Sequence, residues 1–164
     1  MIRIRPASSD EVDALAGIGI AAWKKGIKPH VAAEVAARLE NKNPFVPFLH
    51  KLGTAVLVAD LGGVADVGGV AIGIGACENG GDNISDVWVS PAHEGKGAGS
   101  SLIRALERQI AERGFAEAFI EVAAGNARAL GLYRHLGFVE QWRRPAFDPV
   151  LEITLEKIGL KKRL

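Results

Sequence analysis

Two hydrophobic periods divide the chain into predicted strands and helices. Apolar residues that alternate with polar ones, or short apolar runs bounded by glycine, indicate strands, whereas apolar residues three and four positions apart indicate helices. Residues 44–53 are apolar without a regular period, so we expect a looser segment there. The predicted strands are residues 2–5, 54–60, 69–77, 82–91, 116–122, 138–143 and 150–157, and the predicted helices are residues 8–26, 31–40, 98–113 and 126–136.

The order of these elements predicts an α/β fold. The succession β-α-α-β-β-β-α-β-α-β-β suits a mixed, mostly antiparallel central sheet flanked by helices. The glycine-rich residues 61–69 predict the turn of an antiparallel hairpin. The basic residues 159–164 follow the last predicted strand, and we expect them to form a solvated tail.

Length and composition are those of one globular domain. The chain has 164 residues, of which 48% are hydrophobic and 24% charged, close to the average of folded domains. We therefore expect residues 1–164 to form a single domain. The formal net charge of +1 gives no sign of a surface for nucleic acid or for an anionic membrane.

Several residue types exclude other classes of protein. Cys77 is the single cysteine, which excludes an intrachain disulfide and favours a reducing, cytoplasmic location. The longest apolar stretch is rich in glycine and too short to span a bilayer, and no signal core is visible. The histidines are scattered without the spacing of metal ligands, so we expect no metal site.

The run HEGKGAGSSLIRAL, residues 93–106, places three glycines directly before a helical pattern. Glycine permits positive φ and close approach of the backbone to a ligand, and the free N–H groups of a helix start attract an anion. The spacing fits neither the dinucleotide-binding fingerprint nor the nucleoside-triphosphate loop. On this run alone, a plain strand-to-helix turn and an anion site remain equally open.

A second run, IEVAAGNARALGLYRHLGF at residues 120–138, changes the interpretation of the first. Together with residues 89–99 it resembles the two signature segments of the GCN5-related N-acetyltransferase (GNAT) superfamily, with the pattern closest to the bacterial protein N-terminal (ribosomal-protein alanine) acetyltransferases. Many small-molecule acetyltransferases share this pattern. The resemblance implies the GNAT-type acyl-CoA N-acyltransferase fold, splayed at a cofactor cleft. It also implies direct transfer from acetyl-CoA to a primary amine, in a ternary complex and without a metal.

The resemblance also implies which residues hold acetyl-CoA. The pyrophosphate would lie on backbone N–H groups of the glycine loop and helix start, and the pantetheine arm would lie along the preceding strand. Asn126 matches a residue that contacts this arm, and it also suits the N-cap of the following helix. The implied cofactor-binding residues are Val87, Trp88, Val89, Gly95, Lys96, Gly97, Ala98, Gly99, Ser100, Asn126 and Tyr133.

Three side chains are candidates for proton transfer. An alkylammonium has a pKa of about 10, so the attacking amine needs a base. Glu121 matches the base position of the N-terminal acetyltransferases, although it also suits an outward-facing strand charge. Asp86 is the alternative base and shares a strand face with Trp88, which either stacks on a cationic acceptor or packs in the core. Tyr133 matches the acid that protonates the departing thiolate, and its alternative role is packing.

Glu94 departs from the resemblance, because the family usually has Gln or Arg there and a carboxylate repels a pyrophosphate. We expect Glu94 to point into solvent and Lys96 to offset its charge. A variant, Glu94→Gln, that binds acetyl-CoA no more tightly would agree with this orientation.

Two segments of the chain are candidates for binding the acceptor amine. In the family, acceptor specificity usually comes from the segments here at residues 23–48 and 142–149. Their aromatic residues could wall a pocket, although core and interface roles suit them equally. Residues 143–150 lack the tyrosine pair of the N-terminal acetyltransferases. As the acceptor substrate, a small amine, an amino acid or an aminoglycoside-like molecule is therefore at least as well supported as a ribosomal protein. The expected partners are acetyl-CoA and this amine, without nucleic acid or membrane, and a homodimer is left open.

Two other functions remain open on the sequence. The chain is alternatively a non-catalytic acyl-CoA-binding module, which would bind CoA without thiol release. It is alternatively an O-acyltransferase, which an alcohol acceptor would reveal. Tyr133 and Glu121 together favour catalysis of amine acetylation.

Overall fold

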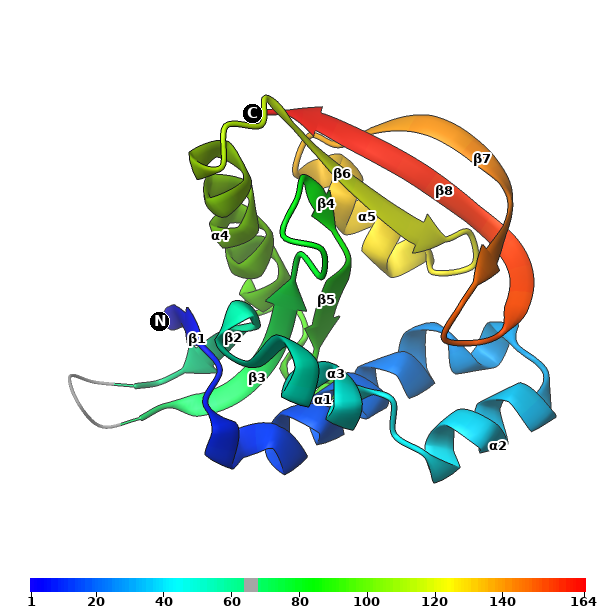
Figure 1. Ribbon diagram of the computed structural model, residues 1–164, viewed down its shortest axis with the longest axis horizontal. Coiled ribbons are helices and arrows are strands. Elements are labelled where there is room, and N and C mark those ends of the chain that lie inside the picture. Colours follow the sequence, from blue (N-terminus) through cyan, green and yellow to red (C-terminus); the bar gives the residue numbers. More distant parts are fainter. Residues whose placement is uncertain (64–67) are drawn as a thin grey trace.

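The computed structural model describes residues 1–63 and 68–164 and contains two four-stranded sheets (Figure 1). The first sheet has the order β1-β2-β3-β5 and is antiparallel throughout. The second has the order β4-β6-β8-β7, in which β4 and β6 run parallel and the other pairs antiparallel. The predicted α/β class with a mixed, mostly antiparallel sheet is confirmed. The strands are β1 (Ile2–Pro6), β2 (Leu57–Leu61), β3 (Val70–Ala76), β4 (Asn83–Ile84), β5 (Asp86–Val89), β6 (Glu117–Ala123), β7 (Val139–Asp148) and β8 (Ile153–Arg163).

The predicted hairpin is formed by β2 and β3, which pair antiparallel from Leu57 opposite Gly75 to Leu61 opposite Val70. Part of its predicted turn, residues 64–67, lies outside the described residues.

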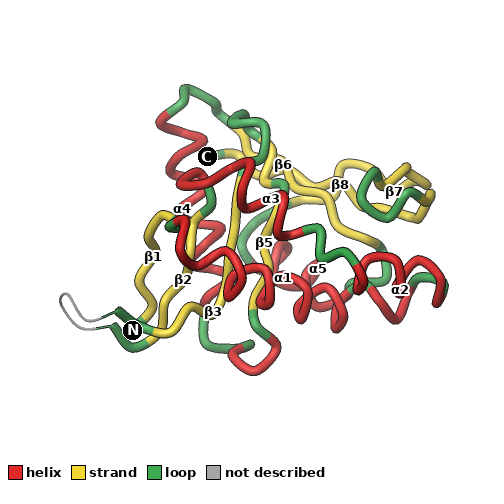
Figure 2. Tube along the Cα trace, turned by 60° about the horizontal axis from the view of Figure 1, so that its bottom comes forward, coloured by secondary structure: helices red, strands yellow, loops and turns green. Residues whose placement is uncertain are grey.

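Helices cover both faces of the first sheet. In Figure 2, α1 and α3 run across one face, while α4 packs against the strands of this sheet from the other. Residues two apart on a regular strand point to the same face, but the pairing of β2 with β3 shifts between Ala59 and Asp60, which makes Ile72 an extra residue on β3. Ile72 belongs to the core under α4, whereas Ile74 belongs to the core under α1. The helices are α1 (Val12–Gly26), α2 (Ala33–Asn41), α3 (Phe45–Leu52), α4 (Ala98–Glu112) and α5 (Ala127–His135), with short 3₁₀ turns at Ser9–Glu11, Lys28–His30, Gly53–Ala55 and Pro91–His93.

No helix in the described part of the chain is both long enough and apolar enough to cross a membrane.

The strand predicted at residues 82–91 is divided between the two sheets. β4 pairs with β6, whereas β5 pairs with β3, and the chain passes from one sheet to the other at Ser85. The Ser85 backbone N–H still donates to the carbonyl of Ala76, 3.0 Å away. β5 therefore lies at the edge of its sheet and does not pair with β6, which leaves the opening that holds the candidate site.

The segment at residues 44–53 is not loose but contains helix α3, so this prediction was wrong. Phe45 and Leu49 are buried one helical turn apart. Pro47 lies in the first turn, where a missing N–H removes no hydrogen bond of the helix. Its presence therefore did not exclude a helix.

The predicted C-terminal tail at residues 159–164 is also a correction. Residues through Arg163 continue β8, which pairs with β6 on one side and β7 on the other. Gly159 and Leu160 are buried, and the indole ring of Trp142 covers Gly159 so closely that a Cβ has no room there. The prediction was wrong because the lysines after Leu160 give the end of this strand the composition of a solvated tail.

Candidate functional site

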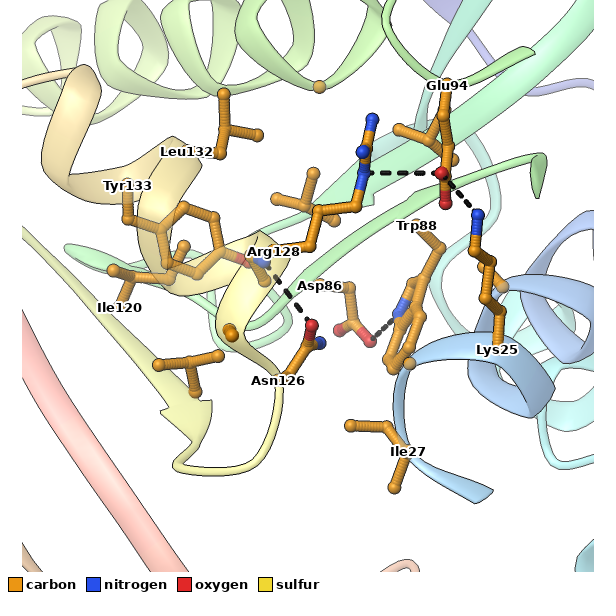
Figure 3. A pocket seen from close by; sticks show the side chains of 18 of the residues that line it. Lys25, Ile27, Asp86, Trp88, Glu94, Ile120, Asn126, Arg128, Leu132 and Tyr133 are labelled. Carbon is orange, nitrogen blue, oxygen red and sulfur yellow. Dashed lines mark hydrogen bonds and ion pairs between the residues drawn. The ribbon is translucent and has the colours of Figure 1, made fainter. Parts of the chain in front are cut away.

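A cavity of about 700 Å³ lies where the two sheets separate, and we call it the first cavity (Figure 3). Its walls come from β5, the glycine loop, the starts of α4 and α5, the end of α1, and β6. Most residues that the resemblance singled out therefore share one space, and Lys96 is the exception among the predicted cofactor residues. Those that line the cavity are Asp86, Val87, Trp88, Val89, Gly95, Gly97, Ala98, Gly99, Ser100, Glu121, Asn126 and Tyr133.

The glycine loop needs its glycines for conformation and for packing. Gly95 and Gly97 have φ of 77° and 91°, values that residues with a Cβ rarely adopt. Gly97 is the N-cap of α4. A Cβ on Gly99 would lie 2.9 Å from the Leu132 side chain, so α4 and α5 approach closely here. The N–H groups at this helix start have no carbonyl partner within the helix, and the loop lines the cavity, as an anion site requires.

Glu94 does not point into solvent, and this expectation was wrong. Its carboxylate lies 2.6 Å from Lys25 Nζ and 3.2 Å from Arg128 Nε, and its side chain is 19% exposed. Lys25 comes from the end of α1 and Arg128 from the start of α5, as Figure 3 shows. These two cations, and not Lys96, offset the charge of Glu94. Neither is adjacent to Glu94 in sequence, so no local pattern could identify them.

Asp86 begins β5 and shares a face with Trp88, as predicted. Its Oδ1 accepts a hydrogen bond from Trp88 Nε1 at 3.0 Å. Burial raises the pKa of the Asp86 carboxyl above its ordinary value, while hydrogen bonds from Trp88 and Ser85 oppose this shift. A carboxylate with a raised pKa in a cavity is a stronger base than one in water.

Trp88 is held by α3, which the sequence analysis did not predict. Its ring meets Phe45 edge to face, with centroids 5.3 Å apart. Phe45 in turn packs over Gly19, where a Cβ would lie 2.5 Å from the ring. The position of the Asp86 hydrogen-bond partner is therefore set by packing between α1 and α3.

Tyr133 and Glu121 line the same cavity in different environments. Tyr133 on α5 is 6% exposed, and burial followed by the charge of Asp86 raises the pKa of its phenol. Within the described residues, no hydrogen bond holds its hydroxyl. Glu121 on β6 is exposed. The phenol therefore stays protonated at neutral pH and is directed by packing alone.

Asn126 caps α5, as its sequence position indicated. Its Oδ1 accepts a hydrogen bond from the Ala129 backbone N–H at 3.3 Å. A Cβ on Gly26, the last residue of α1, would lie 3.2 Å from Asn126 Nδ2. The end of α1 therefore meets the start of α5 at one wall of the first cavity.

A second cavity of about 410 Å³ lies on the α1–α3 side of Trp88. It shares Ile27, Ser85, Asp86 and Trp88 with the first cavity, so Asp86 is accessible from both. The sequence analysis included the aromatic residues of 23–48 as a possible pocket wall, but it did not predict the helix that positions Phe45 and Phe48 there. The other residues that line it are Trp23, Pro44, Phe45, Pro47, Phe48, Lys51, Glu78, Ala123, Asp148, Val150, Leu151 and Leu155.

The segments predicted to surround the acceptor contribute unequally. Residues 23–48 supply most of the aromatic wall of the second cavity. Trp142 does not line it, because its ring covers Gly159 and carries the Arg144 guanidinium 4.1 Å from the ring centroid. Phe147 is 61% exposed and also lies outside the lining.

Curated relatives match the part of the chain that holds these motifs. The [ribosomal protein bS18]-alanine N-acetyltransferase of Escherichia coli strain K12 is 34% identical over 67 residues, which cover 41% of this chain and 45% of that protein. Streptothricin acetyltransferase of Streptomyces lavendulae is 42% identical over 55 residues, 34% of this chain and 29% of that protein. The chain thus spans less than half the length of these relatives.

A solved structure shares the whole fold. The PaiA N-acetyltransferase of Thermoplasma acidophilum, solved in complex with coenzyme A, superposes with a TM-score of 0.74 at 18% identity, covering 100% of this chain and 99% of that one. The predicted GNAT fold is thereby confirmed. The model of the acetyltransferase (GNAT) family matches residues 31–138, which include the glycine loop and most of the cavity wall. With well over half of its length matched, the chain belongs to the acetyltransferase (GNAT) family.

Proposed function

We propose that the protein is an acetyl-CoA-dependent N-acetyltransferase that transfers the acetyl group directly to a primary amine in a ternary complex. The observation that carries this proposal is the first cavity, which joins a helix start suited to an anion to a partly buried carboxyl and a buried phenol. N-acetyltransferases among the relatives, and the coenzyme A complex of a structural neighbour, support it. Acetyl-CoA supplies the activated acyl group, and the residues of this chain bind it and move protons.

The first cavity fits the size and charge of the co-substrate. Its volume of about 700 Å³ lies within the usual ~300–1,000 Å³ of small-molecule sites. Backbone N–H groups from Gly95 to Ser100 would hold the pyrophosphate. Because β5 is an edge strand, alternate backbone groups at Val87 and Val89 are free for the pantetheine arm. An N–H there would also stabilise negative charge that develops on the thioester oxygen. Lys96 is not part of the cavity lining, so its side chain has no proposed contact with acetyl-CoA.

Asp86 is the base that the surroundings favour. It lies between the two cavities, so an amine in the second cavity reaches it without displacing a ligand in the first. Its raised pKa strengthens it as a proton acceptor. Glu121, the base favoured by the resemblance, is exposed on β6 and lines the first cavity only. We therefore propose Asp86 as the group that takes the proton of the amine, directly or through water.

Tyr133 is proposed as the acid that protonates the departing thiolate. A thiol has a pKa of about 8.5, and a phenol whose pKa is raised by burial remains protonated and available as a donor. Its hydroxyl is not engaged by another described residue. Asp86 and Tyr133 thus divide the two proton transfers between two cavity walls.

We also propose that the protein works in the cytoplasm. Cys77 is buried and forms no disulfide in the described structure. A free buried thiol is typical of proteins from reducing compartments.

A screen for release of the CoA thiol from acetyl-CoA tests the function. The panel contains primary amines, peptides with free N-termini, and alcohols. The proposal expects thiol release with at least one amine, matched mole for mole by the N-acetyl product. Binding of CoA without release, or release with alcohols alone, would replace it with the binding-module or O-acyltransferase alternative.

A further inference from the structure

We propose that the acceptor is a monoamine with an apolar, aromatic-sized body, bound in the second cavity with its nitrogen at Asp86. This inference rests on the proposed function and adds the chemical class of the substrate. It is carried by the walls of the second cavity, by the pairing of its charged residues, and by its junction with the first cavity.

The walls of the second cavity are mainly apolar. Aromatic rings come from Trp23, Phe45, Phe48 and Trp88, and aliphatic side chains come from Ile27 directly after α1, the loop after β7, and β8. Transfer of an apolar group from water onto such walls is favourable, whereas burial of an unpaired charge there is not. A ligand that fills this space is therefore apolar over most of its surface.

The rings are fixed before a ligand arrives. Phe45 meets Trp88 and Phe48 edge to face, with centroids 5.3 Å and 6.2 Å apart. Trp88 is also tied to Asp86 by its indole N–H. Because the aromatic wall needs no rearrangement, the cavity selects by shape as well as by polarity.

The charged residues of the cavity, apart from Asp86, already have partners. Glu78 Oε1 lies 3.4 Å from Lys51 Nζ, and Asp148 Oδ2 lies 3.1 Å from Lys157 Nζ. Asp148 also accepts hydrogen bonds from the backbone N–H groups at the following turn. Among the described residues, no cation pairs with Asp86, and it faces both cavities.

A single unpaired carboxylate sets the number of cations that the acceptor carries. One ammonium group at Asp86 is compensated and lies beside the thioester site. Further ammonium groups of a polyamine or an aminoglycoside would face aromatic rings without a counter-charge. The cavity therefore favours one amine on an apolar body over a polycation, and over a small polar amine that leaves the walls uncovered.

Acetylation kinetics with 2-phenylethylamine, ethanolamine and spermidine test this inference. We expect kcat/KM for 2-phenylethylamine to exceed that for ethanolamine on the order of 100-fold, the factor for burying a benzyl-sized group, and spermidine to be poorer than 2-phenylethylamine. Equal or higher kcat/KM for ethanolamine or spermidine would overturn it.

Two variants test whether the acceptor binds in the second cavity. Phe48 is only partly buried, so Phe48→Ala should fold; it is expected to raise KM for 2-phenylethylamine about tenfold, with acetyl-CoA affinity unchanged. The matched control is Phe147→Ala, an exposed phenylalanine outside both cavities, and it should change neither value. An equal effect of both variants on KM would contradict binding in the second cavity.

A binding measurement separates this inference from the proposed function. Titration of 2-phenylethylamine against tryptophan fluorescence reports on Trp23 and Trp88 without turnover. Saturable quenching that Phe48→Ala weakens, with no thiol release from any amine, would support the site and overturn the proposed catalysis. Thiol release with polar amines, without such quenching, would overturn the site and leave the catalysis standing.

Discussion

The two cavities that meet at Asp86 are built in different ways. The first is formed largely by backbone: two glycines at positive φ, a helix start, and the edge of β5. The second is formed by side chains from α1, α3, β5, the turn after β7, and β8. Backbone geometry is encoded locally, so the first cavity leaves a recognisable run in the sequence. The second cavity depends on residues far apart in the chain, so no single run in the sequence identifies it.

This difference predicts how each cavity recognises its ligand. N–H groups of a helix start recognise a pyrophosphate whatever side chains surround them. Aromatic and aliphatic walls recognise one size and polarity of ligand. We therefore expect substitutions in the first cavity to affect every acceptor alike, and substitutions in the second to affect acceptors unequally.

The largest effect is expected for Asp86, which belongs to both cavities. Asp86→Asn removes the proposed base, and kcat should fall about 10²- to 10³-fold, the usual contribution of general base catalysis. In the wild type, kcat should rise with pH through the raised pKa of Asp86 and then level off, because only the carboxylate accepts a proton. Steady-state kinetics over pH, with acetyl-CoA saturating, measure both.

Glu121→Gln is the matched control for this change. It is also a carboxylate at the first cavity, and if Asp86 is the base the variant should change kcat by less than about threefold. A larger loss with Glu121→Gln than with Asp86→Asn would restore Glu121 as the base.

The next largest effect is expected at Tyr133, which lines the first cavity alone. Tyr133→Phe should lower kcat about 100-fold with every amine, while the Kd of acetyl-CoA stays near the wild-type value because the ring remains. Turnover and calorimetric binding measure the two quantities. Unchanged kcat would exclude Tyr133 as the acid. A loss confined to one acceptor would contradict the expectation that substitutions in the first cavity affect every acceptor alike.

A smaller effect is expected at the glycine loop. Gly97 has a φ of 91°, and a Cβ in the left-handed region costs about 1–2 kcal/mol. Gly97→Ala should therefore raise the Kd of acetyl-CoA about tenfold as the loop shifts, with the ratio between acceptors unchanged.

Gly131→Ala is the control for the added methyl group. Gly131 lies in α5, where a Cβ would meet no atom within 4 Å, and alanine suits a helix better than glycine. Its acetyl-CoA affinity should match the wild type. Equal losses in both variants would contradict a specific role for the loop.

The smallest effect is expected at Glu94. Glu94→Gln removes a negative charge beside the proposed pyrophosphate site and frees Lys25 and Arg128. Binding of acetyl-CoA should tighten about three- to tenfold at low salt, and the gain should shrink as salt screens the charges. Calorimetry at two salt concentrations measures this.

Glu107→Gln is the charge-matched control, because Glu107 pairs with Lys162 and lies outside both cavities. It should leave acetyl-CoA binding unchanged. Weaker binding in Glu94→Gln alone would mean that the ion pairs hold the cavity in shape, and it would contradict repulsion between Glu94 and the pyrophosphate.

The fold was predictable where local pattern decides structure. The first strand, the helix after the glycine loop, and the cap at Asn126 follow from periodicity and residue type. The helix at Phe45–Leu52 was missed because its short apolar run shows no regular period. Pro47, in the first turn of this helix, also gave the run the composition of a loop. The break at Ser85 and the pairing of the chain end with β6 depend on long-range contacts that no local pattern contains.

The candidate site was predictable to the same extent. Asp86, Asn126 and Tyr133, which were candidates on the sequence, all line one cavity. The partners of Glu94 come from α1 and α5, so their approach is a property of the folded chain. The aromatic residues of α3 were candidates for a pocket wall on the sequence, but a role in the core could not be distinguished from one in the pocket before the helix was known.

The central claim is that this chain transfers acetyl groups from acetyl-CoA to an amine. Its most direct test follows the CoA thiol and the N-acetyl product together in one reaction with 2-phenylethylamine and its polar counterparts. The account predicts equal amounts of the two products, with turnover lost in Asp86→Asn and Tyr133→Phe. Binding of acetyl-CoA without N-acetyl product from any amine would contradict it.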